Sequence, residues 1–420
     1  MSKFRLPWPA ASRLVLMAAV GVTLGGCATE GGFESRPSPA LPPLPTVSPP
    51  TQPVAPVRQP PPPAIVLPPP VVTPVPVLPP PIASVLNSRA LLNRLLPARI
   101  ADRSGWAADI LGAFEALQIP PRAENFCAAI AVIEQESTFQ SEPAVAGLSR
   151  IVWREIDQRR EKYGVPKVML DLALRKSSPD GRSYSARIDA LRTERQMNTL
   201  YDDMISELPG GKRLFGGFNP IRTGGPMQVG VDFAEEQIRL RPYPYPRRES
   251  VRNEVFTRRG GVYFGIAYLL DYPASYSRMI YRFADFNAGR YSSRNAAFQD
   301  AVSRLSGEKL ARDGDLLRYR NGLPVSEASA TQQAIISLRP RLRLSTAEIV
   351  RDLKLEKSFA FERTPLYERL FALADAAGGR RPRELLPTID LKSPKITRQL
   401  TTEWFARRVD GRYRNCLAGS

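Results

Sequence analysis

A proline-rich segment from about residue 36 to residue 81 constrains the fold of this 420-residue chain more than any other feature. Proline fixes φ and lacks a backbone N–H group, so such a segment adopts extended polyproline II and acts as a semi-rigid spacer. At about 3.1 Å per residue, its reach is on the order of 140 Å. A docking segment for proline-binding modules is the alternative interpretation. In either case, the folded part must be built from about residue 84 onward.

The N-terminus has the pattern of a secretory signal. Three cationic residues precede an apolar run: Lys3, Arg5 and Arg13. The run, Leu14–Leu24, is too short to span a bilayer as a mature helix, which predicts a signal peptide at 1–26. It ends in Leu-Gly-Gly-Cys and resembles the bacterial lipobox, which implies that Cys27 is lipidated and becomes the mature N-terminus. An uncleaved signal with an incidental cysteine is the alternative.

The residue after this cysteine bears on the destination of the protein. Ala28 stands where an aspartate would favour the inner membrane, so resemblance to sorted lipoproteins implies the outer membrane, with the protein facing the periplasm. Residues 27–83 then form a lipid-anchored linker that suits a target at a distance from the membrane. In this oxidising compartment the two remaining cysteines, Cys127 and Cys416, are expected to form a disulfide. Two free buried cysteines are the alternative.

Composition narrows the chemistry. The chain has no histidine, which excludes Ser-His-Asp and Cys-His catalysis and removes the commonest metal ligand. Phosphate-cradling loops, cysteine–histidine metal sets and nucleophile elbows are also missing from the sequence, so we expect no cofactor and no metal. The formal net charge of +18 predicts affinity for polyanions. Without a nucleic-acid motif, the basic stretches at 378–385 and 407–415 suit an anionic cell-wall mesh or a solvated surface, and not nucleic acid.

The residues beyond 84 have the pattern of a mainly α-helical protein, without internal repeats or sustained strand alternation. The expected helices include 150–162, 185–206, 261–272 and 276–286. We expect one helical domain at 84–304 and a helical C-terminal extension packed on it at 305–420.

Three helix starts are predicted within the C-terminal extension. Ser345 and Glu348 form a capping-box pattern, and Thr364-Pro365 opens a helix closed by Gly378-Gly379. Another helix is expected to open at Ser393-Pro394, with three apolar residues spaced by four. These residues are Ile396, Leu400 and Trp404.

Two glutamates at the end of "ENFCAAIAVIEQES" differ in helical phase. An apolar face is formed at i, i+3, i+4 and i+7 by Phe126, Ala129, Ile130 and Ile133. Glu136 belongs on or beside this face, whereas Glu134 lies about 100° from Ile133 and is expected to be solvated. Partial burial raises the pKa of a carboxyl group, and a protonated carboxyl in a cleft is what protonation of a glycosidic oxygen requires. A glutamate at the rim of the core is the alternative.

Four stretches occur in an order that resembles the soluble lytic transglycosylases of the lysozyme-like superfamily. They are "ESTF" (136–139), "TGGPMQVG" (223–230), "GVYFGIAYLL" (261–270) and "ADFNAGRY" (284–291). In that family an E-S pair, a G-x-M-Q turn, a G-x-x-x-L helix and a Y-N-A-G turn follow one another. The resemblance covers roughly 120–300 and implies a lysozyme-like, goose-type helical domain, here in a less studied group of proline-linked bacterial lipoproteins.

The resemblance also implies an activity. Glu136 would be the lone acid/base that cleaves the bond between N-acetylmuramic acid and N-acetylglucosamine in peptidoglycan, leaving a 1,6-anhydro end. This mechanism uses one carboxylate where most glycosidases use two. Ser137 matches the serine that fixes the glutamate region, and Gln228 and Asn287 match residues that hydrogen-bond sugar or the acid. Met227 would be a wall or core residue of the binding cleft.

Two departures from the family pattern leave alternatives open. Phe286 stands where the family usually has tyrosine, so a hydroxyl near the glutamate is missing unless Tyr281 or Tyr291 replaces it. Glu136 and Gln228 are also 92 positions apart (228 − 136), which predicts a helical insertion at about 148–212. The insertion would cover the cleft, restrict it to chain ends, or bind a partner.

These departures keep two other functions in consideration. One is a non-catalytic peptidoglycan-binding or scaffolding lipoprotein with a degenerate cleft. The other is a hydrolase that uses Glu136 with water and requires a second carboxylate, which the sequence does not single out.

Overall fold

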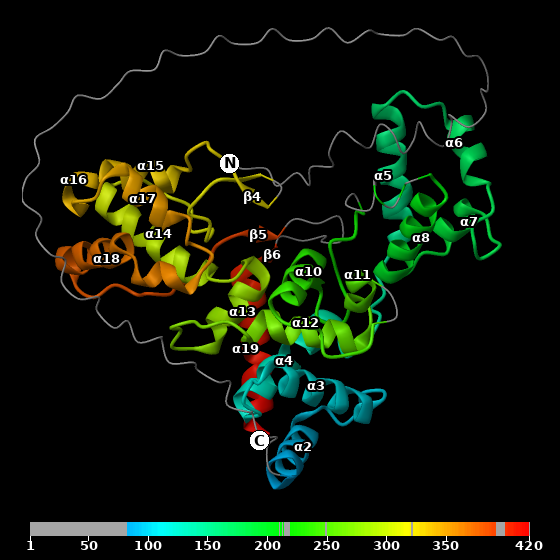
Figure 1. The fold of residues 1–420 in the computed structure, drawn as a ribbon, viewed down its shortest axis with the longest axis horizontal. Helices are drawn as coiled ribbons and strands as arrows, with labels where there is room; N and C mark the ends of the chain where they lie inside the picture. Colours follow the sequence, from blue (N-terminus) through cyan, green and yellow to red (C-terminus); the bar gives the residue numbers. More distant parts are fainter. Residues whose placement is uncertain are drawn as a thin grey trace, which may run out of the picture. The chain divides into compact units, whose positions relative to one another are not determined.

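The computed structural model describes residues 82–419, apart from 210, 212, 214–218, 248–249, 321 and 392–399. The predicted signal peptide, Cys27 and the proline-rich linker therefore lie outside the described residues. The same is true of the predicted helix start at Ser393-Pro394 and of Ile396. The described part is mainly α-helical, as predicted, with three short two-stranded antiparallel sheets (Figure 1).

The first core contains most of the motif residues. Its helices are α2 (Ile82–Leu95), α3 (Arg103–Leu117), α4 (Ala123–Ser137), α10 (Val231–Leu240), α11 (Val251–Val255), α12 (Arg258–Leu270), α13 (Met279–Ala288) and α19 (Thr402–Ala418). The hairpin β1 (Thr223–Gly224) and β2 (Val229–Gly230) joins them, with Thr223 opposite Gly230 and Gly224 opposite Val229. Two predicted helices, 261–272 and 276–286, correspond to α12 and α13 with shifted ends.

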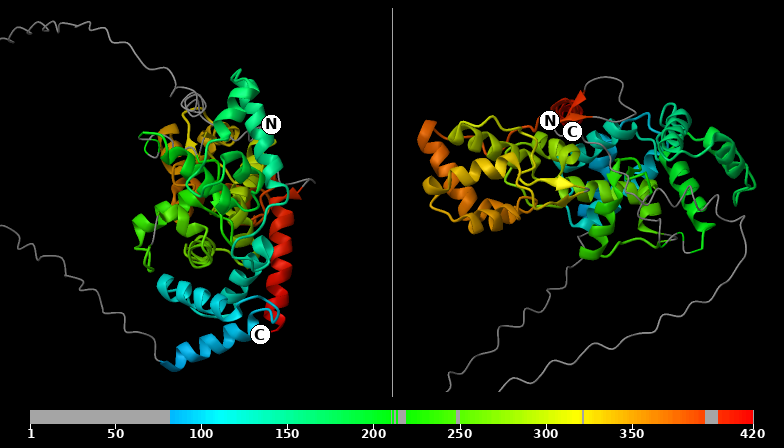
Figure 2. Two further views of the ribbon diagram at one scale, coloured as in Figure 1. Left: turned by 90° about the vertical axis from the view of Figure 1, so that its right-hand side faces the viewer. Right: turned by 90° about the horizontal axis from the view of Figure 1, so that it is seen from above.

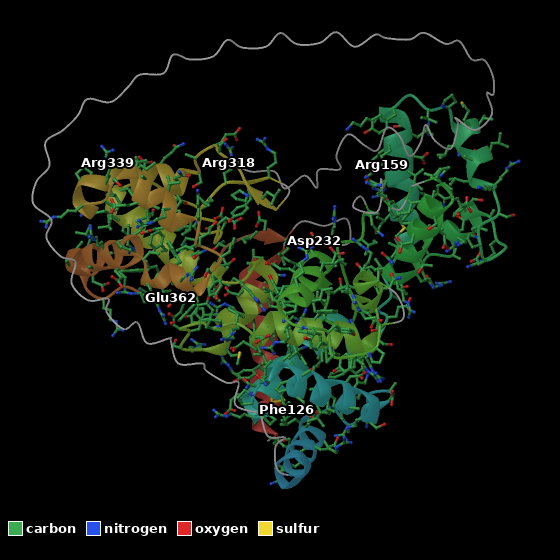
Figure 3. All side chains as sticks on the ribbon, viewed as in Figure 1. Phe126, Arg159, Asp232, Arg318, Arg339 and Glu362 are labelled. Carbon is green, nitrogen blue, oxygen red and sulfur yellow. A yellow bond between two sulfur atoms is a disulfide. The ribbon has the colours of Figure 1, made fainter. Side chains whose placement is uncertain are left out.

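Helix α4 is the centre of this core. The eight residues from Phe126, labelled in Figure 3, to Ile133 are each at most 2% exposed, so this part of α4 is buried on all sides and not on one face alone. This burial follows from the uniformly apolar "FCAAIAVI" run, because a helix without a polar face must be covered all round. Helices α2, α12 and α19 supply this cover (Figure 1, Figure 2).

A disulfide joins α4 to the last helix of the chain. Cys127 of α4 is bonded to Cys416 of α19 across a sequence separation of 289 residues. Helix α19 also packs on α13, so the C-terminal helix contacts two of the helices that carry motif residues. The last helix of the chain is thus part of the first core.

The insertion segment, residues 148–206, has a small hydrophobic cluster of its own. Its helices are α5 (Leu148–Lys162), α6 (Lys167–Leu174), α7 (Tyr184–Asp189) and α8 (Glu194–Ser206) (Figure 1). The single helix predicted at 185–206 is wrong, because the chain leaves the helix after Asp189 and starts a new one at Thr193. Thr193 caps α8 and forms a capping box with Gln196, which accounts for the new start.

A C-terminal core is formed by the residues from about 297 to 374. Its elements are α14 (Ser292–Ser306), α15 (Ala330–Ser337), α16 (Arg339–Leu342), α17 (Thr346–Leu353), the 3₁₀ helix η3 (Phe359–Arg363), α18 (Pro365–Gly378) and the hairpin β3 (Tyr319–Arg320) and β4 (Leu323–Pro324). The predicted capping box of Ser345 and Glu348 is confirmed, and so is the helix that starts after Thr364.

The final helix starts later than its apolar spacing predicts. Leu400 lies in β6 (Leu400–Thr401) and pairs with Leu391 of β5 (Asp390–Leu391), so the expectation that Leu400 and Trp404 share a helix is wrong. Helix α19 begins at Thr402, where the side chain of Thr401 accepts a hydrogen bond from the Trp404 amide. Of the helices in the described ranges, none has both the length and the apolar character needed to cross a membrane.

Candidate functional site

The last turn of α4 carries Glu136 and Ser137. Ser137 is 5% exposed, and its hydroxyl donates a hydrogen bond of 2.9 Å to the carbonyl of Ile133. The Ser137 hydroxyl is therefore bonded within its own helix, in the same turn as Glu136. Glu136 is half-buried. Glu134 is also half-buried: its side chain is 39% exposed, and its Oε1 lies 3.7 Å from Arg412 Nε of α19. The predicted contrast between a partly buried Glu136 and a solvated Glu134 is therefore not seen in their burial.

The backbone beyond Glu136 is unusual. Thr138 and Phe139 have φ of 50° and 58°, and Gln228 has φ of 50°. Positive φ is rare for residues with a Cβ, and for a bulky residue such as phenylalanine it requires tight surroundings. Phe139 has such surroundings, since it is 6% exposed and its ring lies 5.1 Å from that of Trp106 in an edge contact. Thr138 is the left-handed C-cap of α4, whereas Phe139 and Gln228 lie in turns outside regular elements. Because strained backbone gathers at functional sites, these two positions support a candidate site at the end of α4 and in the hairpin turn.

The turn of "TGGPMQVG" is shaped by its glycines. Gly225 has φ of 72°, and a Cβ placed there would lie 2.1 Å from the carbonyl oxygen of Val255. A Cβ on Gly224 would lie 2.2 Å from the ring of Phe256. The turn therefore lies against the end of α11 at a distance that only glycine permits.

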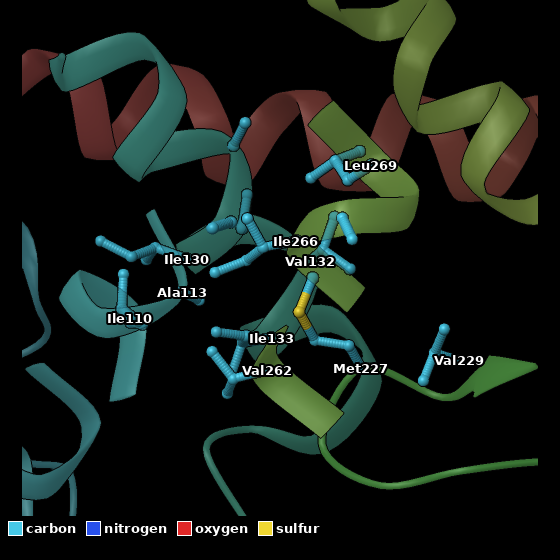
Figure 4. Close-up of a cluster of buried hydrophobic side chains, with 14 of the residues drawn as sticks. Ile110, Ala113, Ile130, Val132, Ile133, Met227, Val229, Val262, Ile266 and Leu269 are labelled. Carbon is cyan, nitrogen blue, oxygen red and sulfur yellow. The ribbon is translucent and has the colours of Figure 1, made fainter. Parts of the chain in front are cut away.

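Met227 and the glycines of α12 fit together. A Cβ on Gly265 would lie 2.4 Å from Met227 Sδ, and one on Gly261 would lie 2.5 Å from Pro226 Cδ. Met227 is fully buried, which makes it a core residue and rules out direct contact with a substrate. Figure 4 shows its side chain among Val132, Ile133, Val262 and Ile266. The stretch before Glu136, the hairpin turn and the G-x-x-x-L helix thus share one core.

The end of α13 presents the fourth motif. Phe286 is partly buried against the first core, with its ring 5.4 Å from that of Tyr268. Asn287 is exposed. The two tyrosines considered as replacements for the missing hydroxyl lie in other contacts: Tyr291 packs on Tyr272 at 5.3 Å and Tyr281 on Tyr276 at 5.9 Å. Burial raises the pKa of Tyr268, whose ring contacts that of Phe286.

Asp285, the residue before Phe286, was not predicted and has a structural role. It is 1% exposed and accepts hydrogen bonds from the Tyr272 and Tyr276 hydroxyls and from the Tyr291 and Ser293 amides, at 2.6 to 3.1 Å. Burial raises the pKa of this carboxyl group, and the four donors oppose that effect. Asp285 therefore holds the turn between α13 and α14 in place.

Gln228 makes a contact that the sequence did not predict. Its side-chain Nε2 donates a hydrogen bond of 2.8 Å to Oε2 of Glu194, the first residue of α8 in the insertion segment. Glu194 is only 5% exposed. The capping pattern Thr193-x-x-Gln196 is the signal from which this helix start could have been predicted, but the pairing across 34 positions has no local signal.

Three cavities of about 350, 540 and 1240 Å³ lie elsewhere on the described residues. The largest lies between α8 and the α11–α12 region and is lined by charged and polar side chains, among them Arg195, Asp202, Arg252 and Arg258. Neither Glu136 nor Gln228 nor Asn287 lines any of the three. Among the residues that the structure describes, no group of three or more acidic or cysteine side chains has the arrangement of a metal site.

The chain belongs to a protein family described as "Protein of unknown function (DUF1615)", whose model matches residues 99–419. It is 50% identical over 333 residues to the uncharacterized protein YaiW of Escherichia coli strain K12, a match that covers 79% of this chain and 90% of the relative. No solved structure matches the chain.

Proposed function

We propose that the protein is a peptidoglycan lytic transglycosylase with a lysozyme-like helical domain, in which Glu136 is the single acid/base. One observation carries the proposal. Glu136 lies in the last turn of α4, beside a strained turn, and the buried run of this helix shares its core with the Pro226-Met227 turn and with Gly265 of α12. These are three of the four stretches that resemble the transglycosylases, and Phe286 of the fourth packs against the same core.

The proposed reaction needs only one carboxyl group. Glu136 gives its proton to the oxygen that bridges N-acetylmuramic acid and N-acetylglucosamine, and the bond from that oxygen to the muramyl C1 breaks. The acetamido group of the substrate stabilises the developing positive charge. The Glu136 carboxylate then accepts the proton of the muramyl C6 hydroxyl, whose oxygen bonds to C1. The products are a 1,6-anhydro end on the muramyl residue and a free hydroxyl group on the N-acetylglucosamine residue, and no water is consumed.

The N-terminal features complete the proposal. Cys27 carries the lipid anchor in the outer membrane, and residues 27–83 allow the folded part to reach glycan strands in the periplasm. The net charge of +18 favours association with an anionic mesh. Peptidoglycan and the membrane are therefore the proposed partners, and no cofactor takes part.

The test compares two glutamates of the same helix end. Full-length wild type, Glu136→Gln and Glu134→Gln are purified in detergent and incubated with sacculi, and the released fragments are analysed by mass spectrometry. We expect anhydromuropeptides from wild type and from Glu134→Gln, and a loss of about 100-fold or more for Glu136→Gln, because general acid catalysis contributes that much. Equal release by all three proteins would refute the role of Glu136.

A non-catalytic peptidoglycan-binding role is the second candidate, and one observation favours it. The Gln228 side-chain amide donates to Glu194 and to the carbonyl of Gly225, so its nitrogen is committed to the protein. In that case the same assay gives no release from any variant, while the wild-type protein still sediments with the sacculi. Reducing ends in place of anhydro ends would instead indicate a hydrolase.

A further inference from the structure

The insertion segment reaches the candidate site through the start of α8. Ala144, eight positions after Glu136, forms an antiparallel bridge with Thr193, and the Val145 amide donates 2.8 Å to the carbonyl of Arg192. The Thr193 hydroxyl also donates to the Glu142 carboxylate. The chain that leaves the strained turn is thus paired directly with the residues that open α8.

The opposite side of this helix start holds the hairpin turn. Glu194 accepts the hydrogen bond from Gln228 Nε2 at 2.8 Å, and the Gly225 carbonyl accepts a second one at 3.3 Å. A carboxylate only accepts hydrogen bonds, so the amide nitrogen and not the amide oxygen must face Glu194. The orientation of the Gln228 carboxamide is therefore determined by chemistry as well as by geometry.

The other polar atom of the same carboxamide is its carbonyl oxygen, Oε1. Among the described residues, no side chain or backbone group donates a hydrogen bond to Gln228 Oε1. Gln228 itself is half-buried, at a turn held by Gly225. An oxygen in this position accepts a hydrogen bond from a hydroxyl or from an acetamido N–H, and both donors are abundant on a glycan strand.

Helix α8 is held firmly enough to keep this arrangement. Asn198, 1% exposed, donates 3.0 Å to Asn253 Oδ1 and accepts 2.8 Å from Asn219, which is fully buried. Buried amides that are paired on several sides resist movement because any shift leaves them unpaired. The Glu194 carboxylate therefore occupies a defined position relative to the turn.

We propose that Glu194 is a positioning residue of the candidate site, which holds Gln228 so that its carbonyl oxygen accepts a hydrogen bond from a glycan hydroxyl or acetamido group. The insertion segment is then a working part of the site and not only a cover. This inference rests on the proposed function, in which Gln228 contacts the glycan. The competing explanation is a structural role for Glu194, as an acidic residue in the first turn of α8 that stabilises the helix end.

A double-mutant cycle separates these two explanations. Glu194→Gln keeps the shape of the side chain but allows the Gln228 amide to turn around, because its own amide both donates and accepts. The variants are Glu194→Gln, Gln228→Ala and the double variant, each as full-length protein in detergent. The kcat/KM for release of anhydromuropeptides from sacculi and the thermal midpoint are measured for each. Glu142→Gln is the matched control and is also combined with Gln228→Ala. It removes a charge beside Thr193 at the start of α8 but does not contact Gln228.

If Glu194 acts through Gln228, Glu194→Gln lowers kcat/KM about 10-fold in the wild-type background and less than about twofold in the Gln228→Ala background, since a charge-assisted hydrogen bond contributes on that scale. Glu142→Gln is expected to change kcat/KM by the same factor in the wild-type and Gln228→Ala backgrounds. Equal losses for Glu194→Gln in both backgrounds, accompanied by a lower thermal midpoint, overturn the positioning role.

The outcome also distinguishes this inference from the proposed function. If release of anhydromuropeptides depends on Glu136 but the effects of Glu194→Gln and Gln228→Ala are additive, only the positioning role is refuted. If no variant releases products, the double-mutant cycle is repeated with the fraction of protein that sediments with sacculi as the readout. Non-additive losses of sedimentation would then support the positioning role of Glu194 and refute catalysis. Absence of both release and sedimentation rejects both proposals.

Discussion

The first core and the insertion segment are stabilised by different interactions. Along α4, eight consecutive residues are at most 2% exposed, and glycines of α12 let the hairpin turn approach closely. The insertion segment instead leaves Val168 and Leu172 of α6 78% and 71% exposed. Its contacts include the exposed ion pairs of Lys167 with Asp171 at 3.0 Å and of Arg182 with Asp180 at 2.7 Å.

This difference bears on how the site is assembled. Burial of apolar surface stabilises a fold strongly, whereas exposed ion pairs contribute little and are screened by salt. We therefore expect the insertion segment to open at a lower free energy than the first core. Since Glu136 belongs to the core and Glu194 to the insertion segment, the candidate site combines one region of high stability with one of lower stability.

The largest expected effect comes from the disulfide. Replacing Cys127 and Cys416 by alanine removes a link across 289 residues, and we expect the free energy of unfolding to fall by about 3 to 5 kcal/mol. Denaturant unfolding measures the loss, and hydrogen exchange locates it. Faster exchange should appear first in α4 and α19. If the insertion segment responds first, the two regions are not distinct.

A smaller effect is expected at the contact between α12 and the hairpin turn. Gly265→Ala places a Cβ 2.4 Å from Met227 Sδ, and we expect a loss of about 1 to 3 kcal/mol because the packed core must shift. Gly411→Ala is the matched control, since this helical glycine in α19 has open space around its Cα. The control should be neutral or stabilising by up to about 1 kcal/mol. Similar unfolding midpoints for the two variants would contradict close packing at Gly265.

Asn198→Ala tests the polar anchoring of α8. It removes the partner of the buried Asn219 amide and of Asn253, and we expect a loss of about 1 to 2 kcal/mol because buried polar groups lose their hydrogen bonds. Hydrogen exchange should accelerate in α8, while exchange in α4 stays unchanged. Uniform acceleration in both helices would show that the two regions unfold as one unit.

Lowering the pH is expected to reduce the contribution of Asp180 to the stability of the insertion segment and to increase that of Asp285 to the stability of the first core. Arg182 beside Asp180 of the insertion segment holds the pKa of that carboxyl below its usual value of 3.8, so this stabilisation is present above that pH and is lost as the pH falls through the lower value. Burial raises the pKa of Asp285 in the first core, so its ionised form costs stability at neutral pH and protonation relieves that cost.

The Asp180 contribution is the smallest of these effects because the group is exposed. Thermal midpoints of wild type and Asp180→Asn, measured at pH 7 and pH 3, provide the test. The variant should lose less stability on acidification than wild type does. A larger loss in the variant would contradict the assignment.

Local patterns predicted the elements better than the contacts between them. The capping box at Ser345 and the start of α18 after Thr364 depend on residues within four positions, so the sequence was sufficient. The break between α7 and α8 had a comparable signal in Thr193 and Gln196, which was not used in predicting a single helix at 185–206. Leu400 was misassigned because its pairing with Leu391 is set by a tertiary contact.

The candidate site shows the same division. The helical phase of α4 placed Glu136 on or beside the apolar face, but it could not show that Glu134 pairs with Arg412 of α19. The burial of Met227 depends on Gly265, 38 positions further on (265 − 227), and the partner of Gln228 comes from a different helix group. Contacts of this kind follow from packing and leave no periodic trace in the sequence.

The most direct test of the account is digestion of sacculi in water labelled with heavy oxygen. Because the C6 hydroxyl of the muramyl residue closes the ring, the account predicts Glu136-dependent products with anhydro ends that carry no label. Labelled reducing ends, or unlabelled anhydro ends that persist in Glu136→Gln, would contradict it.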